Sequence, residues 1–201
     1  ANGVSTVKCS TQYMSTGYGR VSAIFDPLND AAGGHWELGQ YSNGVSIKTT
    51  ALVPGVNAYT GDWVTFTTPT CFSMTSTKFT ARASYPTRVP GLFVIYARNL
   101  DDDVWTPIFT QTVRASHESI IPVNLGGVCY LQYGLVVHDT LGPTDTVLNI
   151  DNWIIMGKYH TRVDAVNNAM SQYSRSSGMN NVISLYGAVG TRWTWPTLPI
   201  V

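Results

Sequence analysis

The sequence predicts an all-β domain, an antiparallel β-sandwich of the jelly-roll kind. Short strand-like segments recur along residues 17–158 with turn residues between them. No helix-length periodic segment interrupts them, which argues against a parallel α/β sheet. The length of 201 residues suits one domain of sandwich size with a modest extension.

The elements are expected in the following order. Residues 1–16 are polar and form an N-terminal arm or a first edge strand. Residues 61–66 alternate Trp63 and Thr65 against Val64 and Phe66, the period of a half-buried strand. The other strand-like segments are 45–53, 72–83, 92–97, 104–112, 120–123, 129–137 and 147–155.

The most informative segment runs from Pro90 to Trp105. An apolar run ends in the polar turn residues Asn99 and Asp101–Asp103, and a second strand restarts near Trp105. Asn and Asp tolerate turn conformations that β-branched residues resist, so this pattern predicts a β-hairpin.

The pattern changes after Gly157, and residues 159–201 are expected to form a C-terminal extension. Apolar residues at 163, 166, 170 and 173 predict a short helix that stops at Gly178, and residues 182–186 resemble a strand. The tail carries Trp193 and Trp195. An aromatic tail beyond a closed sandwich leads us to expect assembly contacts with neighbouring subunits there.

Composition excludes some classes of partner. The chain has 12 basic and 12 acidic residues and no cluster of Lys or Arg, so it lacks the basic stripe that nucleic acid requires. It also has no apolar run of the ~18 residues that span a bilayer. Charged residues are only 12% of the chain. Such a surface suits weak polar recognition or burial in a larger assembly.

The three cysteines, Cys9, Cys71 and Cys129, have no metal-ligand spacing. Because their number is odd, at least one is unpaired within the chain. We expect three buried, reduced thiols, with one disulfide as the alternative in an oxidising compartment.

The order of these elements resembles the discoidin-like β-sandwiches, which include the coagulation factor 5/8 C-type domains and galactose-binding-like carbohydrate-binding modules. The resemblance covers residues 17–158. The segments that carry it are Ala23–Asp26 with Trp36, Gly61–Val64, Lys78–Ala83, Pro90–Trp105, Tyr130–Val137 and Ile150–Gly157. It implies a galactose-binding-like sandwich that binds ligands at the loops of one end.

Two departures from the family limit what the resemblance implies. The family's calcium loop is only partly matched by Asp26 and Asp30, so we expect an Asx-stabilised turn and no cofactor, with calcium as the alternative. The family's terminal cysteine pair is also missing, since Cys9 has no partner near the closing strand.

Sugar recognition on this fold combines an aromatic face with groups that hydrogen-bond hydroxyls. The expected contact surface combines segments 30–41 and 82–88. Its candidate residues are His35, Trp36, Tyr41, Arg82, Tyr85 and Arg88. For Trp36, as for Trp63, Trp105 and Trp153, a place in the core is the reading that a large apolar side chain beside a strand favours. The residues predicted to form the inter-sheet core are Trp63, Phe93, Tyr96, Trp105, Leu135 and Trp153.

No arrangement of residues indicates catalysis. His138 and Asp139 are adjacent, and adjacent strand residues point to opposite faces unless a bulge intervenes. The expected function is therefore non-enzymatic: a structural protein of a virion, as a capsid, fibre or appendage subunit. The alternative is a carbohydrate-binding module that attaches to glycans. Either places the chain on a virion or an extracellular surface, with protein subunits and glycans as its partners.

Overall fold

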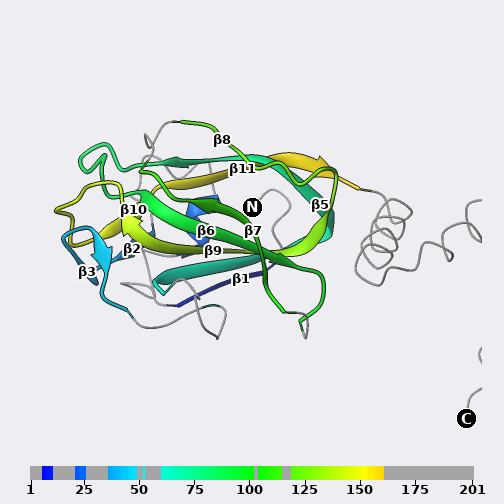
Figure 1. Cartoon of the computed structure of the whole chain (residues 1–201), viewed down its shortest axis with the longest axis horizontal. Helices are drawn as coiled ribbons and strands as arrows, with labels where there is room; N and C mark the ends of the chain where they lie inside the picture. The colour runs from blue at the N-terminus through cyan, green and yellow to red at the C-terminus, as the bar shows by residue number, and fades with distance from the viewer. Residues whose placement is uncertain are drawn as a thin grey trace, which may run out of the picture. The chain divides into compact units, whose positions relative to one another are not determined.

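The computed structural model describes residues 6–10, 21–25, 36–48, 52, 60–101, 104–114 and 119–160. These residues belong to one compact unit of the chain, and they form β-strands and one short 3-10 helix (Figure 1). The elements are β1 (Thr6–Cys9), η1 (Val21–Phe25), β2 (Trp36–Leu38), β3 (Tyr41–Ser42), β4 (Val45–Ser46), β5 (Asp62–Thr80), β6 (Pro90–Arg98), β7 (Thr106–Gln111), β8 (Ile121–Pro122), β9 (Tyr130–Thr140), β10 (Leu148–Ile150) and β11 (Asn152–Tyr159).

One layer of the sandwich is built around β9. This strand pairs antiparallel with the first part of β5 on one side and with β6 on the other, while β1 and β7 extend the sheet outward. The predicted hairpin is confirmed as β6 and β7. Residues 6–9, which we assigned to an arm or an edge strand, form the edge strand β1.

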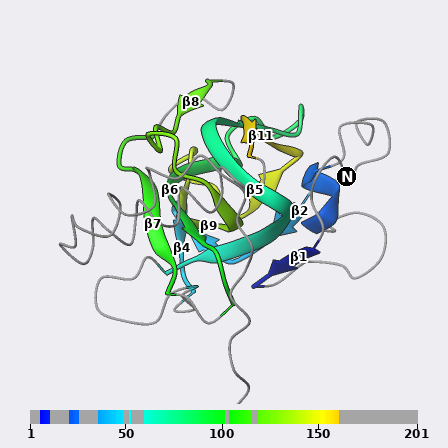
Figure 2. The same cartoon turned by 90° about the vertical axis from the view of Figure 1, so that its right-hand side faces the viewer.

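The second layer grows from the same strand β5. Its later residues pair with β11 and β8, so a single strand of 19 residues belongs to both layers. Figure 2 shows β5 as a curved ribbon passing from the neighbourhood of β1 to that of β11. The sequence had suggested two strands here. They are one because β5 continues through exposed Pro69, where its pairing with β9 is interrupted between Thr67 and Phe72.

Aromatic side chains from the two layers meet in the core. The ring of Phe66 lies 5.3 Å from that of Trp153, and Phe79 lies 5.1 Å from Phe93, both edge to face. The Trp153 indole donates a 2.7 Å hydrogen bond to the Thr77 hydroxyl, which satisfies its buried N–H. The predictions that Phe93, Leu135 and Trp153 lie in the core are confirmed.

Three other predicted core residues lie on the opposite face of the sheet. Tyr96 packs with Val94 and Val136 in a small separate cluster, covered by partly buried Trp63 and Trp105. The guanidinium of Arg98 lies 4.4 Å from the Trp105 ring centroid. The prediction of an inter-sheet position is therefore wrong for Trp63, Tyr96 and Trp105, because this sheet carries apolar side chains on its outer face as well as on its inner one.

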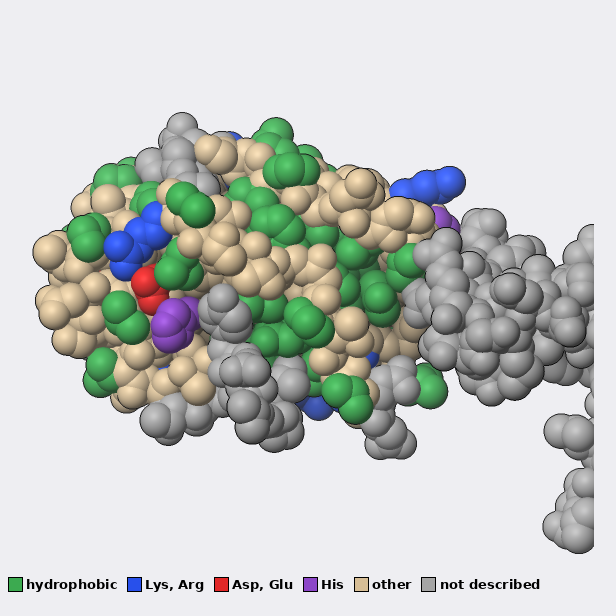
Figure 3. All heavy atoms as spheres, viewed as in Figure 1, with side chains coloured by type: hydrophobic (Ala, Val, Ile, Leu, Met, Phe, Trp, Pro, Cys, Tyr) green, Lys and Arg blue, Asp and Glu red, His purple; other side chains and the backbone are tan. Residues whose placement is uncertain are grey.

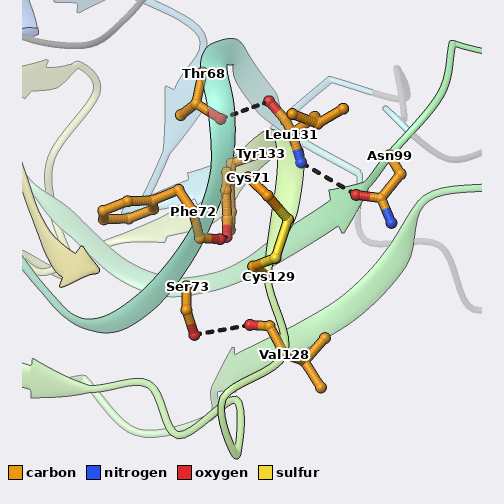
Figure 4. Close-up of a disulfide and its surroundings, with 9 residues drawn as sticks. All are labelled: Thr68, Cys71, Phe72, Ser73, Asn99, Val128, Cys129, Leu131 and Tyr133. Carbon is orange, nitrogen blue, oxygen red and sulfur yellow. Dashed lines mark hydrogen bonds between the residues drawn. A yellow bond between two sulfur atoms is a disulfide. The ribbon is translucent and has the colours of Figure 1, made fainter. Parts of the chain in front are cut away.

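A disulfide joins Cys71 to Cys129, so our expectation of three reduced thiols is wrong. Cys71 lies within β5 and Cys129 directly precedes β9, which brings their Cα atoms to 5.4 Å. Around the bridge, Ser73 donates to the Val128 carbonyl and Thr68 to that of Leu131 (Figure 4). Cys9 is a free thiol, and burial, with Asp62 nearby, raises its pKa. The pairing could not be read from the sequence because 58 residues separate the two cysteines.

Several expectations lie outside the described residues. They are the helix expected over 163–173, the strand expected over 182–186 and the whole of the tail with Trp193 and Trp195. The assembly role of that tail stays a prediction. No helix among the described residues is long and apolar enough to cross a bilayer.

Candidate functional site

The loop between β5 and β6 presents three candidate residues on two successive turns. The Tyr85 amide donates to the Arg82 carbonyl at 2.8 Å, and the Arg88 amide donates to the Tyr85 carbonyl at 3.2 Å. Pro86 occupies the second position of the second turn, where its fixed φ is favourable. Because each turn of four residues brings its first and last residues together, Arg82, Tyr85 and Arg88 lie close to one another.

Within this loop, Tyr85 lies against two guanidinium groups. Arg88 is 3.8 Å from the ring centroid and Arg82 is 5.5 Å from it. The Tyr85 side chain remains 39% exposed, so the ring is not part of the core. An exposed aromatic ring beside guanidinium donors offers an apolar face and several N–H groups to one ligand.

A second loop, residues 141–147, supports the first. Its Asp145 carboxylate lies 3.8 Å from Arg88 Nε, and the other carboxylate oxygen is buried with no hydrogen-bond partner among the described residues. Backbone hydrogen bonds join the loops, from Leu141 N to the Val89 carbonyl and from Gly142 N to the Thr87 carbonyl. The arrangement therefore fixes two cations, an acceptor and an aromatic ring. We name Arg82, Tyr85, Arg88 and Asp145 the Tyr85 cluster.

A third segment, the turn between β3 and β4, also holds the loop that carries Asp145. Asn43 and Gly44 both have positive φ, 52° and 75°, and turn β3 into β4 as a two-residue hairpin. The Gly44 amide donates to the Asp145 carbonyl at 2.9 Å. The loop that carries Asp145 is thus held from two sides by main-chain bonds.

The structure contradicts two of our candidate site residues. Trp36 is fully buried, since β2 pairs with β10 and directs the indole into the main core. Tyr41 is 4% exposed, and its hydroxyl donates to the Val137 carbonyl at 3.2 Å. Burial, assisted by Asp62, raises the Tyr41 pKa well above its ordinary value. Neither ring can stack on a ligand, so their assignment to the contact surface is wrong. For Trp36 the alternative, a core position, is correct.

Other candidates fall outside the described residues. His35 and the two carboxylates of the calcium alternative, Asp26 and Asp30, belong to this group. Within the described part of the chain, no group of three or more His, Cys, Asp or Glu side chains could hold a metal ion.

Asp145 is the member of the Tyr85 cluster that sequence reasoning missed. It lies 57 residues after Arg88 in a Gly-Pro-Thr-Asp stretch that reads as an ordinary turn. Only the pairing of the two loops in space brings it to Arg88. A turn signal between two strands locates such a loop, but it does not identify the loop's neighbour.

Comparisons with solved structures identify the fold. The chain resembles the CBM32-3 module of a family 31 glycoside hydrolase from Clostridium perfringens, with a TM-score of 0.55, 11% identity, and 78% of this chain and 92% of that chain covered. A chitosan-binding module from the chitosanase/glucanase of Paenibacillus sp. IK-5 gives a TM-score of 0.52, 12% identity and coverage of 76% and 94%. A search of family models and one of curated proteins find no match.

A third structure, CpGH89CBM32-5 from Clostridium perfringens, was solved in complex with GalNAc-β-1,3-galactose. It gives a TM-score of 0.52 at 8% identity, covering 75% of this chain and 94% of that chain. At such identities the likeness establishes architecture. The chain therefore has the discoidin-like, galactose-binding-like β-sandwich fold, as its sequence predicted. These neighbours do not support a virion origin, which stays a prediction.

Proposed function

We propose that this chain is a non-catalytic carbohydrate-binding module and that the Tyr85 cluster contacts the glycan. The observation that carries the proposal is the exposed Tyr85 ring beside Arg82 and Arg88, on loops fixed by backbone hydrogen bonds. The structural neighbours named as carbohydrate-binding modules favour this function over the virion subunit that we preferred from sequence.

The chemistry of the Tyr85 cluster suits a sugar. A tyrosine ring can cover the C–H face of a pyranose, while guanidinium groups donate paired hydrogen bonds to hydroxyls or to a sugar carboxylate. Asp145 supplies an acceptor for a hydroxyl proton. A shallow site with one exposed ring gives weak affinity, so useful attachment comes from several copies or from linkage to another binding domain.

The disulfide supports an extracellular location for this function. Disulfides persist in oxidising compartments and are rare where thiol-reducing systems operate. The Cys71–Cys129 bridge is nearly buried, at 7% and 1% exposure, and forms part of the fold. We therefore place the module outside the cell, where glycans are displayed.

A glycan array probed with a multivalent form of the protein tests the proposal. We expect binding to a restricted set of glycans and, for a positive glycan, at least a tenfold loss of affinity in Tyr85→Ala, since stacking and two flanking donors are disturbed together. Ile154→Ala is the matched control, because Ile154 is 40% exposed, as Tyr85 is to 39%, but lies on β11, outside the cluster.

Two results would contradict the proposal. Glycan binding that survives Tyr85→Ala combined with Arg82→Ala would place the site elsewhere. Absence of binding across neutral, acidic and amino sugars would remove the glycan function, and a large regular oligomer in solution would then favour the structural role.

A further inference from the structure

Charged side chains are few in this chain, and most of the described arginines are matched to a carboxylate. The chain has 12 basic and 12 acidic residues among 201. On the face drawn in Figure 3 they form a few small groups within a coloured surface that is mostly hydrophobic or uncharged. The ion pairs that join an arginine to an aspartate are Arg88–Asp145, Arg98–Asp101 and Arg114–Asp139.

Arg82 is the exception among the four arginines that the structure describes, since no ion pair joins it to a described carboxylate. Its side chain is partly exposed, and its guanidinium lies 5.5 Å from the centroid of the Tyr85 ring. An aromatic ring attracts a cation through its quadrupole but carries no net charge. The positive charge of Arg82 is therefore held in place without being neutralised.

A second guanidinium lies against the same ring, but its charge is neutralised. Arg88 is 3.8 Å from the Tyr85 centroid, and its Nε lies 3.8 Å from Asp145 Oδ1. The other Asp145 oxygen is buried beside Gly142, where a Cβ would approach it to 2.2 Å. Two guanidinium groups and one carboxylate leave the Tyr85 cluster with one positive charge.

This charge lies on a surface loop whose backbone is fixed. Residues 83–87 are all exposed. The Arg82 carbonyl accepts from the Tyr85 amide, and the Tyr85 carbonyl accepts from the Arg88 amide, at 2.8 and 3.2 Å. A ligand can therefore approach the exposed ring and the neighbouring guanidinium together, and the loop does not have to be ordered when the ligand binds.

A guanidinium without a carboxylate partner is best matched by a planar anion. It donates two parallel N–H···O hydrogen bonds to a carboxylate, and such charged bonds are stronger than those to a neutral hydroxyl. The 5.5 Å between Arg82 and the Tyr85 centroid allows one sugar residue to contact both groups. A neutral sugar would leave the charge of Arg82 in place, whereas a sugar acid would neutralise it.

We propose that the Tyr85 cluster binds a sugar that carries a carboxylate, and that Arg82 determines this specificity. The sugar carboxylate accepts two hydrogen bonds from the Arg82 guanidinium while the sugar ring packs against Tyr85. Arg88, held by Asp145, donates to a hydroxyl of the same sugar. The inference rests on the proposed function for the position of the site and goes beyond it in naming the class of sugar.

Three matched pairs of sugars test the proposal: D-galacturonate with D-galactose, D-glucuronate with D-glucose, and D-mannuronate with D-mannose. The members of a pair share their hydroxyl orientations and differ only at C6, so the ratio of their dissociation constants isolates the carboxylate. NMR titration of the full chain measures each constant. We expect at least one uronate to bind about tenfold more tightly than its neutral partner. Added salt should reduce this ratio, because it screens an exposed ion pair.

Substitutions of Arg82 show whether this residue is responsible. Arg82→Gln should weaken uronate binding about tenfold and bring the pair close to equal affinity, since the amide donates without a charge. Arg82→Lys should keep part of the preference, because an ammonium retains the charge but not the paired donors. Lys158→Gln is the matched control, since it removes one positive charge from an exposed residue of β11, outside the cluster, and should leave the ratio unchanged.

The possible failures of the two proposals are distinguishable. Equal affinities within every pair, together with loss of that binding in Tyr85→Ala, would overturn the specificity for sugar acids and keep the proposed function. A preference for a uronate that survives Arg82→Gln would also overturn the role of Arg82. Binding of none of these sugars, nor of any glycan on the array, would remove both proposals.

Discussion

Just before its first residue β9 is held by a disulfide at Cys129 and by nearby aromatic rings in edge-to-face and tilted contact, whereas around its last residue the loops are held by main-chain hydrogen bonds. The strand is 11 residues long, so these two ends are roughly 30 Å apart. The disulfide end buries apolar surface. Its residues are Cys71, Phe72, Cys129, Tyr133 and Tyr159. The loop end carries Tyr85, two arginines and Asp145 instead.

From this difference we infer that the disulfide end contributes mainly to stability and the loop end mainly to binding. At the disulfide end Phe72, Tyr133 and Tyr159 pack around a covalent link, so substitutions there should change the free energy of unfolding. At the loop end the Asp145 carboxylate has an oxygen with no hydrogen-bond partner among the described residues. The backbone of this loop is held by hydrogen bonds from neighbouring loops. Side-chain substitutions there that leave the backbone undisturbed should change binding at little cost in stability.

Phe72→Ala should have the largest effect on stability. Phe72 is 6% exposed and its ring lies 6.1 Å from Tyr133 and 4.9 Å from Tyr159. Truncating a buried phenylalanine removes these contacts and leaves a cavity, which costs about 3–5 kcal/mol. Urea unfolding measures the loss, and a value below about 1 kcal/mol would contradict the assignment of this end to stability.

Loss of the disulfide should have the next largest effect. A bridge across 58 residues restricts the unfolded chain, and its removal typically costs about 2–4 kcal/mol. Cys71→Ser with Cys129→Ser should lower the urea midpoint while leaving glycan affinity unchanged. Cys9→Ser is the control, since Cys9 is a free thiol. An equal shift in the control would show that thiol chemistry in general is responsible.

Gly44→Ala tests whether the loop end is rigid. Gly44 has φ of 75°, and a Cβ there would lie 2.4 Å from the Gly142 carbonyl oxygen. We expect a loss of about 1–3 kcal/mol from backbone strain, together with weaker glycan binding because the loop of Asp145 is displaced. Ser42→Ala, an exposed change in the same hairpin, should alter neither quantity. Unchanged binding in Gly44→Ala would show that this loop does not position the site.

Tyr85→Ala should have the smallest effect on stability. The ring is 39% exposed and belongs to neither hydrophobic cluster, so the unfolding free energy should change by about 0.5 kcal/mol or less. Thermal unfolding of the variant beside the wild type measures this directly. A loss comparable to that of Phe72→Ala would mean that Tyr85 is structural and would remove the contrast between the two ends.

The strands were predictable because local alternation and turn residues mark them. Residues 61–66 and the hairpin of β6 and β7 follow such patterns, and the order of elements was enough to identify the fold. The continuity of β5 was hidden by Pro69, a residue that usually ends a strand but here falls where pairing is interrupted. A sequence pattern reports the conformational preference of each segment. It does not show where a strand will lack a hydrogen-bonded neighbour and can therefore accept a proline.

The candidate site was predictable only in part. Tyr85, Arg82 and Arg88 lie within seven residues, so their proximity follows from two local turns. Asp145 and the disulfide depend on contacts between segments more than 50 residues apart. Trp36 was a site candidate because it lies at the end of a loop, but its short strand pairs with β10 and faces the core. The bulge at His138 arises from the register between β9 and β6, in which Val137 pairs with Phe93 and Asp139 pairs with Leu92. Composition does not reveal that register.

The shared strand β5 determines how this protein can open. In a sandwich whose layers have separate strands, one layer can detach while the other persists, and its amide protons then exchange with solvent independently. Here the residues that pair with β9 and those that pair with β11 belong to one continuous strand. Neither layer can leave without pulling on the other, so the slowest-exchanging amides of both should report one global, cooperative event.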